Sequence, residues 1–160
     1  MEEMLNGKDA LEMAIKAEEK GLELYRALAK NSKNFHVSQI FKELAREEER
    51  HVEELKKWDK SLASYKPVEA YPGEYSLYIK AMAEENVFKC DKACERSIEK
   101  DISEEDAAAA AINFEKDFML FLHNVKKHIK KGEERIVNAI IDSEEKHLKQ
   151  LYTLQKKIKK

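Results

Sequence analysis

Two short motifs, each a glutamate followed three residues later by a histidine, are the best candidates in this chain for binding a metal. Glu48 and His51 form the first motif, and Glu144 and His147 repeat it 96 residues later. Side chains three residues apart share one face of a helix, so each motif can offer a carboxylate and an imidazole to the same ion. One such motif means little in a glutamate-rich chain, but two in matching positions of a repeat indicate a metal site.

Two further glutamates, Glu18 and Glu115, precede the motifs by about 30 residues and lie 97 residues apart. Helical spacing places both of them, and both motifs, on otherwise apolar stripes. All six side chains should therefore point into the core, and a rise of about 1.5 Å per residue puts them at similar depth along their helices. The remaining histidines lack this context and are expected at the surface or at helix ends: His36, His123 and His128.

Four carboxylates in an apolar core require compensation. A single unpaired buried carboxylate costs several kcal/mol, and several together also repel one another. The central stripe positions hold no Lys or Arg, so two divalent ions are the simplest source of positive charge. Oxygen and imidazole ligands suit iron or manganese, and a Glu from two helices with Glu-x-x-His from two others is the di-iron or di-manganese carboxylate pattern. The alternative is a metal-free bundle whose core carboxylates are protonated or hydrogen-bonded.

Apolar residues at helical spacing predict four helices that would position these side chains. They cover about residues 10–31, 35–61, 104–130 and 133–157. Asp9 with Glu12 resembles a capping box, while Asn34 and Ser103 are suited to cap the second and third helices. Gly132 is expected to follow the end of the third helix.

Short links join the first helix to the second and the third to the fourth, so each pair should form an antiparallel hairpin, at about 10–61 and 104–157. Segment 62–103 connects the hairpins and is far longer than a turn requires. The chain is therefore predicted to be one all-α domain, residues 1–160, with a ferritin-like four-helix bundle and one long crossover. Because the hairpins are related by an internal repeat, they should face each other with approximate two-fold symmetry.

Composition excludes several other classes of protein. Charged residues make up 39% and apolar residues 42%, so the chain is neither disordered nor membrane-spanning. The net charge of −2 argues against nucleic acid as a partner. The acidic start at Met1 does not resemble a signal peptide, which predicts a cytoplasmic protein. Cys90 and Cys94 are expected to be reduced and incidental.

The sequence resembles the rubrerythrin-like branch of the ferritin-like di-iron proteins. The matching segments are residues 14–25, 41–55, 111–122 and 136–151. The resemblance implies two iron ions, with manganese as the alternative metal. It also implies a role for each ligand. Glu18 and Glu115 would each bind mainly one metal, Glu48 and Glu144 would bridge the pair, and His51 and His147 would cap opposite ions.

Three departures from that family limit what the resemblance implies. The sequence has two cysteines rather than the two cysteine pairs of a rubredoxin domain, so we expect electrons to come from a separate protein such as a rubredoxin. Phe118 stands where rubrerythrins proper carry an additional glutamate ligand, which favours a symmetric centre of six ligands. Tyr25 follows Glu18 by seven residues, but Leu122 stands in the equivalent place after Glu115, so only one half of the site has a tyrosine to support a ligand.

The resemblance implies an oxidoreductase that reduces hydrogen peroxide or oxygen at a di-iron centre. A protein that binds, stores or senses iron without turnover is the main alternative. Exposed Tyr and Met residues of the crossover are candidates for a homodimer contact.

Overall fold

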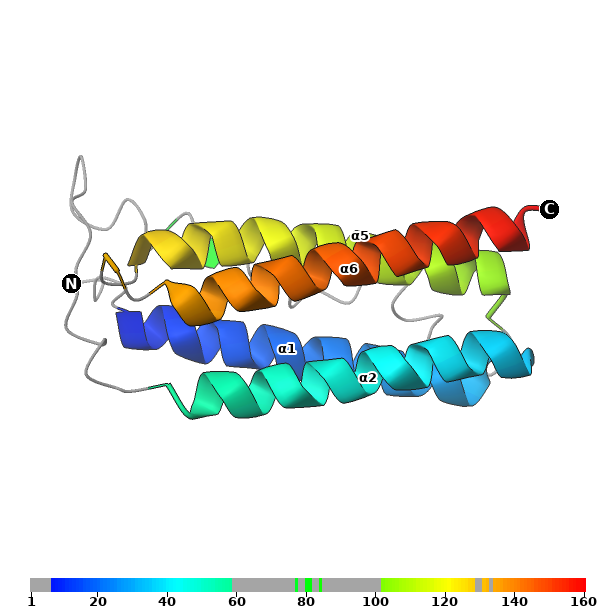
Figure 1. The fold of residues 1–160 in the computed structure, drawn as a ribbon, viewed down its shortest axis with the longest axis horizontal. Helices are drawn as coiled ribbons and strands as arrows, with labels where there is room; N and C mark the ends of the chain where they lie inside the picture. The colour runs from blue at the N-terminus through cyan, green and yellow to red at the C-terminus, as the bar shows by residue number, and fades with distance from the viewer. Residues whose placement is uncertain are drawn as a thin grey trace.

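The computed structural model describes residues 7–58, 77, 80, 81, 84, 102–128, 131, 132 and 134–160; for residues 7–10 and 128 it describes the backbone alone. Four long helices make up most of this part of the chain (Figure 1). They are α1 (Gly7–Asn31), α2 (Phe35–Lys56), α5 (Glu104–Val125) and α6 (Arg135–Ile158), and a short 3-10 turn, η3 (Lys126–His128), follows α5.

Two of the predicted helix caps are confirmed. The Asn34 side chain accepts hydrogen bonds from the backbone N–H groups of His36 and Val37, at 2.9 and 3.2 Å. Ser103 Oγ accepts from the backbone N–H of Asp106 at 3.0 Å. Each cap satisfies N–H groups that have no partner within the helix, which fixes the start of α2 and of α5.

Other helix ends differ from the prediction. Helix α1 begins at Gly7, so Asp9 lies inside its first turn and is not the cap. Helix α2 ends at Lys56, earlier than expected, with Lys57 as its C-cap, and the Trp58 side chain just beyond it packs into the core. Helix α6 begins at Arg135, after Gly132 has turned the backbone with a φ of 96°, a conformation that favours glycine.

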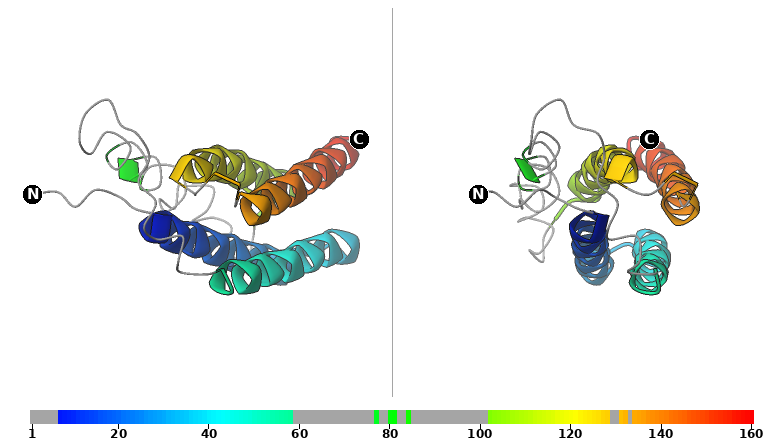
Figure 2. Two further views of the ribbon diagram at one scale, coloured as in Figure 1. Left: turned by 60° about the vertical axis from the view of Figure 1, so that its left-hand side comes forward. Right: turned by 90° about the vertical axis from the view of Figure 1, so that its left-hand side faces the viewer.

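The four helices pack as a square, and each is antiparallel to both of its neighbours (Figures 1 and 2). Helix α1 contacts α2 and α5, and α6 contacts the same two helices. Helix α2 finishes at one end of the bundle and α5 begins at the other, which is the arrangement that a long crossover requires. The predicted all-α, ferritin-like bundle is therefore confirmed, whereas almost all of segment 62–103, with Cys90, Cys94 and the candidate dimer contacts, lies outside the described residues.

The apolar core is divided into two clusters, one toward each end of the bundle. One cluster includes Leu55, Trp58, Phe118, Phe121, Val137 and Ile140. The other includes Leu28, Val37, Phe41, Leu44, Ala111 and Leu151. On every helix the predicted polar side chains lie between the segments that supply these clusters, so a polar layer crosses the middle of the bundle.

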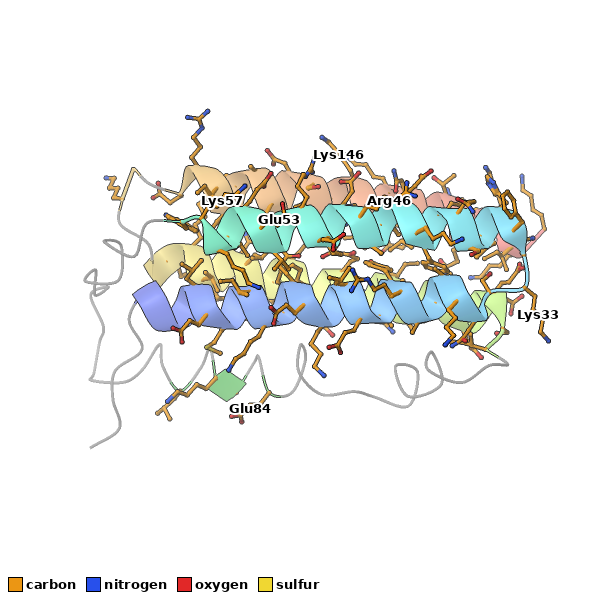
Figure 3. The ribbon with its side chains drawn as sticks, turned by 90° about the horizontal axis from the view of Figure 1, so that it is seen from below. Lys33, Arg46, Glu53, Lys57, Glu84 and Lys146 are labelled. Atoms are coloured by element: carbon orange, nitrogen blue, oxygen red, sulfur yellow. The ribbon has the colours of Figure 1, made fainter. Side chains whose placement is uncertain are left out.

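Charged residues cover the outside of the bundle. Arg46 and Glu53 on α2 and Lys146 on α6 are exposed and extend from the outer surface (Figure 3). Among the described helices, none has a stretch long and apolar enough to cross a membrane.

Candidate metal centre

All six side chains singled out from the sequence lie together in the polar layer between the apolar clusters. The four carboxylates are fully buried, and the two imidazoles are 1% exposed: Glu18, Glu48, Glu115 and Glu144, and His51 and His147. They come from all four helices, which position them from the four corners of the bundle. The expected convergence of these residues at one depth is what the structure shows.

The six residues form two overlapping groups. Glu18 and His51 share one group with Glu48 and Glu144, and Glu115 and His147 share the other with the same two glutamates. Within each group, one ligand atom from every residue lies within 4.8 Å of the others. Because Glu48 and Glu144 belong to both groups, the geometry fits two neighbouring ions that share two carboxylates.

Both imidazoles present Nδ1 to the cluster. His51 Nδ1 lies 2.9 Å from Glu144 Oε1 and 3.4 Å from Glu18 Oε2. His147 Nδ1 lies 2.8 Å from Glu144 Oε2 and 3.1 Å from Glu48 Oε1. The two rings are stacked, with centroids 5.8 Å apart. Each histidine therefore turns one nitrogen inward and leaves Nε2 on the side away from the cluster.

Ten buried nitrogen and oxygen atoms of these six residues make no well-aligned hydrogen bond, although several of them lie close to one another. Buried polar atoms in proteins are almost always paired, and an unpaired one costs free energy. So many convergent unpaired atoms, all of them oxygen or imidazole nitrogen, fit a site for divalent cations such as iron or manganese.

The pKa values of the carboxyl groups also indicate that the cluster, without metal, lacks positive charge. Burial, with the neighbouring charge of Glu48, raises the pKa of Glu18 well above its ordinary value. Burial and the charge of Glu144 do the same to the pKa of Glu115. Burial alone would raise the pKa of Glu144, but the close imidazoles of His147 and His51 hold it at about 2.

The neighbouring carboxylates favour a positive charge on His147 in the absence of metal. Burial alone would lower its pKa, but the carboxylates of Glu115, Glu144 and Glu48 close to its Nδ1 raise the pKa well above the ordinary value. In the absence of metal, these shifts favour protons bound within the cluster, so metal binding is expected to release protons.

Two neighbouring side chains make hydrogen bonds to the cluster from outside it. Tyr25, which the sequence marked as a supporting residue, donates to Glu115 Oε1 of the opposite hairpin. Glu47 was missed by sequence reasoning. Its Oε2 atom is 3.3 Å from Nε2 of His147 and 3.3 Å from Ser143 Oγ. Partial burial alone would raise the pKa of Glu47, but its contact with His147 holds the pKa below the ordinary value.

Gly21 was also missed, although it touches the site. A Cβ at this position would lie 3.1 Å from Glu48 Oε2 and 2.8 Å from Cε1 of Phe114. The absence of a side chain at Gly21 therefore makes room for the Glu48 carboxylate.

The position where rubrerythrins carry an additional ligand is apolar, as the sequence indicated. Phe118 is fully buried and stacks with Phe114 and Phe121, at ring-centroid distances of 5.9 and 6.3 Å. Of the other histidines, His36 and His123 are exposed, as expected, and the side chain of His128 lies outside the described residues.

Comparisons with known proteins agree with this geometry. The family model described as Rubrerythrin matches residues 9–155. A crystal structure from Thermotoga maritima, described as a ferritin-like diiron-carboxylate protein, is similar to this chain with a TM-score of 0.73 and 25% sequence identity, and the match covers 98% of each chain. No curated protein matches. With a ferritin-like bundle, a buried carboxylate and histidine cluster able to bind metal, and a family match over nearly its whole length, the chain belongs to the rubrerythrin family.

Proposed function

We propose that this protein is a di-iron carboxylate oxidoreductase that reduces hydrogen peroxide or oxygen, with electrons supplied by a separate donor protein such as a rubredoxin. The observation that carries the proposal is the pair of overlapping ligand groups, in which four buried carboxylates and two imidazoles surround two adjacent positions. The family and the similar diiron-carboxylate structure support iron as the metal.

In this proposal the ligands divide according to the groups they belong to. Glu48 and Glu144 would serve as ligands to both ions, since they are common to both groups. Glu18 and His51 complete one position, which we call the Glu18–His51 site. Glu115 and His147 complete the other, the Glu115–His147 site.

A ferrous pair held at these positions would supply the two electrons that cleave the O–O bond of the oxidant, which for peroxide takes up two protons and gives two water molecules. The chain itself holds the ligands in place and keeps bulk water away, because an apolar cluster closes the polar layer on each side along the bundle. Four carboxylates and two imidazoles cannot fill two octahedral coordination spheres, so positions remain open for a small oxidant.

Iron content and turnover together test the proposal. Protein purified without oxygen and loaded with ferrous iron should hold about two ions per chain, and it should consume many equivalents of peroxide when an excess of reductant is supplied. Peroxide consumption that stops after one equivalent per centre would contradict catalysis and favour an iron-binding protein. Failure to retain any metal would contradict both.

A further inference from the structure

The two proposed metal sites have equivalent ligands but unequal surroundings. The internal repeat relates Glu18 to Glu115, Glu48 to Glu144 and His51 to His147. If the repeat extended to the neighbouring residues, each hydrogen bond that supports one site would have a counterpart at the other.

At the Glu115–His147 site, both ligands that belong to this site alone are held from outside the cluster. Tyr25 donates its hydroxyl proton to Glu115 Oε1. The Glu47 carboxylate accepts from Nε2 of His147 at 3.3 Å, and Ser143 Oγ and Arg50 lie 3.3 and 3.5 Å from the same Glu47 oxygen. Both supporting side chains come from the first hairpin and reach across to ligands of the second.

At the Glu18–His51 site, the same supports are missing among the described residues. No described residue outside the cluster makes a hydrogen bond to either carboxylate oxygen of Glu18 or to Nε2 of His51. The repeat explains why, because Leu122 stands at the position equivalent to Tyr25, and Ser143 at the position equivalent to Glu47. A leucine cannot donate a hydrogen bond, and Ser143 instead directs its hydroxyl to Glu47.

These contacts change how well each ligand binds a cation. A carboxylate that accepts from Nε2–H fixes the imidazole in the tautomer with Nδ1 free for the metal, holds the ring in place and makes Nδ1 more basic. The tyrosine similarly holds Glu115 in one orientation before an ion arrives. His51 and Glu18 must be ordered by the ion itself, which lowers the affinity of their site.

We propose that the two positions bind metal unequally: the Glu115–His147 site fills first and retains its ion, while the Glu18–His51 site fills second and exchanges its ion readily. Glu47 and Tyr25 act as positioning residues for the first site. This inference rests on the proposed two-ion centre, but it does not depend on which oxidant is reduced.

Titration of the metal-free protein with Co²⁺ under anaerobic conditions, followed by calorimetry and by the visible spectrum, tests the proposal. We expect two resolved steps of one ion each. His51→Ala should keep the tight step and lose the weak one, and His147→Ala should lose the tight step. The reverse assignment, or two ions bound in one unresolved step, overturns the inference while leaving the two-ion centre intact. Absence of a second ion in the unmodified protein overturns the two-ion centre as well.

Variants at Glu47 separate positioning from general stability. Glu47→Ala should weaken the tight step about 10- to 100-fold and leave the weak step unchanged, and Glu47→Gln, which keeps an acceptor oxygen, should recover part of the loss. Glu54→Ala is the matched control, because Glu54 is similarly exposed and also pairs with Arg50, at 3.7 Å. Equal effects of Glu47→Ala and Glu54→Ala, or weakening of the weak step alone, would overturn the role of Glu47. Far-ultraviolet circular dichroism of each variant shows whether the helices are retained.

Discussion

Replacement of Gly21 by alanine tests how closely the structure defines the position of Glu48, the proposed bridging carboxylate. Glycine inside a helix is less favourable than alanine by about 1 kcal/mol, so on propensity alone the Gly21→Ala variant should be more stable. The structure predicts the opposite. The new Cβ would lie 2.8 Å from the Phe114 ring and 3.1 Å from Glu48 Oε2, and both contacts are too short to persist without movement.

The size of the effect follows from these two contacts. Overpacking of this kind costs about 1–3 kcal/mol, which the gain in helix propensity offsets in part, so the metal-free variant should be destabilised by at most about 2 kcal/mol. For a chain of this length that lowers Tm by up to about 8 °C. Metal binding should suffer more, since ligand distances tolerate only about 0.2 Å of error and Glu48 would have to move by a few tenths of an ångström. We expect the affinity for at least one ion to fall about tenfold.

Thermal unfolding of the metal-free protein and Co²⁺ titration of the same samples measure the two effects. The double variant Gly21→Ala/Phe114→Leu relieves the contact with the ring but keeps the contact with Glu48. It should therefore recover part of the lost stability relative to a Phe114→Leu reference without recovering metal affinity. A Gly21→Ala protein that is about 1 kcal/mol more stable than the parent and binds both ions normally would refute the placement of Glu48 beside Gly21.

Three other predictions concern the ligands, the pH dependence and the metal. Glu48→Ala or Glu144→Ala should abolish binding of at least one ion, whereas Glu53→Ala, an exposed change on α2, should retain both by elemental analysis. The raised pKa values of Glu18, Glu115 and His147 mean that the folded metal-free protein binds more protons than the unfolded chain above about pH 5. Its Tm should therefore fall as pH rises from about 5 to 8, and a Tm that rises over this range would contradict the buried carboxylate cluster. Removing metal with a chelator at pH 8 should lower Tm in the parent protein, because bound ions stabilise the folded state; an unchanged Tm would argue against two tightly bound ions.

The fold and the six candidate ligands were predictable because helical periodicity is a local property of sequence. Residues three or four apart share a face whatever the rest of the chain does, so the apolar stripes alone place Glu18, Glu48 and Glu115 in the core. Asn34 and Ser103 were predictable for the same reason, since a cap acts on N–H groups two or three residues away. Asp9 shows the limit of such local rules. Asp9 and Glu12 resemble a capping box, but helix α1 begins at Gly7, so Asp9 lies within the helix.

The supporting residues were harder to predict because their contacts cross between the hairpins. Tyr25 and Glu115 are 90 residues apart, and Glu47 and His147 are 100 residues apart. Periodicity places Glu47 only at the edge of a buried stripe, three residues after Leu44, where a solvated glutamate is equally compatible. Gly21 carries no signal at all until the neighbouring helix brings Phe114 against it. Contacts of this kind depend on how the hairpins dock, which no local pattern specifies.

The internal repeat therefore carries two kinds of information. Every candidate ligand has its counterpart, as expected if charge balance around two divalent ions requires all of them. The residues one layer further out do not match: Tyr25 corresponds to Leu122, Glu47 to Ser143, and Gly21 to the buried Phe118. The hydrogen bonds that result all support the Glu115–His147 site. Symmetry of the ligands by itself would predict two equivalent ions, so an unequal pair would have to arise from these outer residues. Measuring the two binding steps separately is the experiment that distinguishes the two cases.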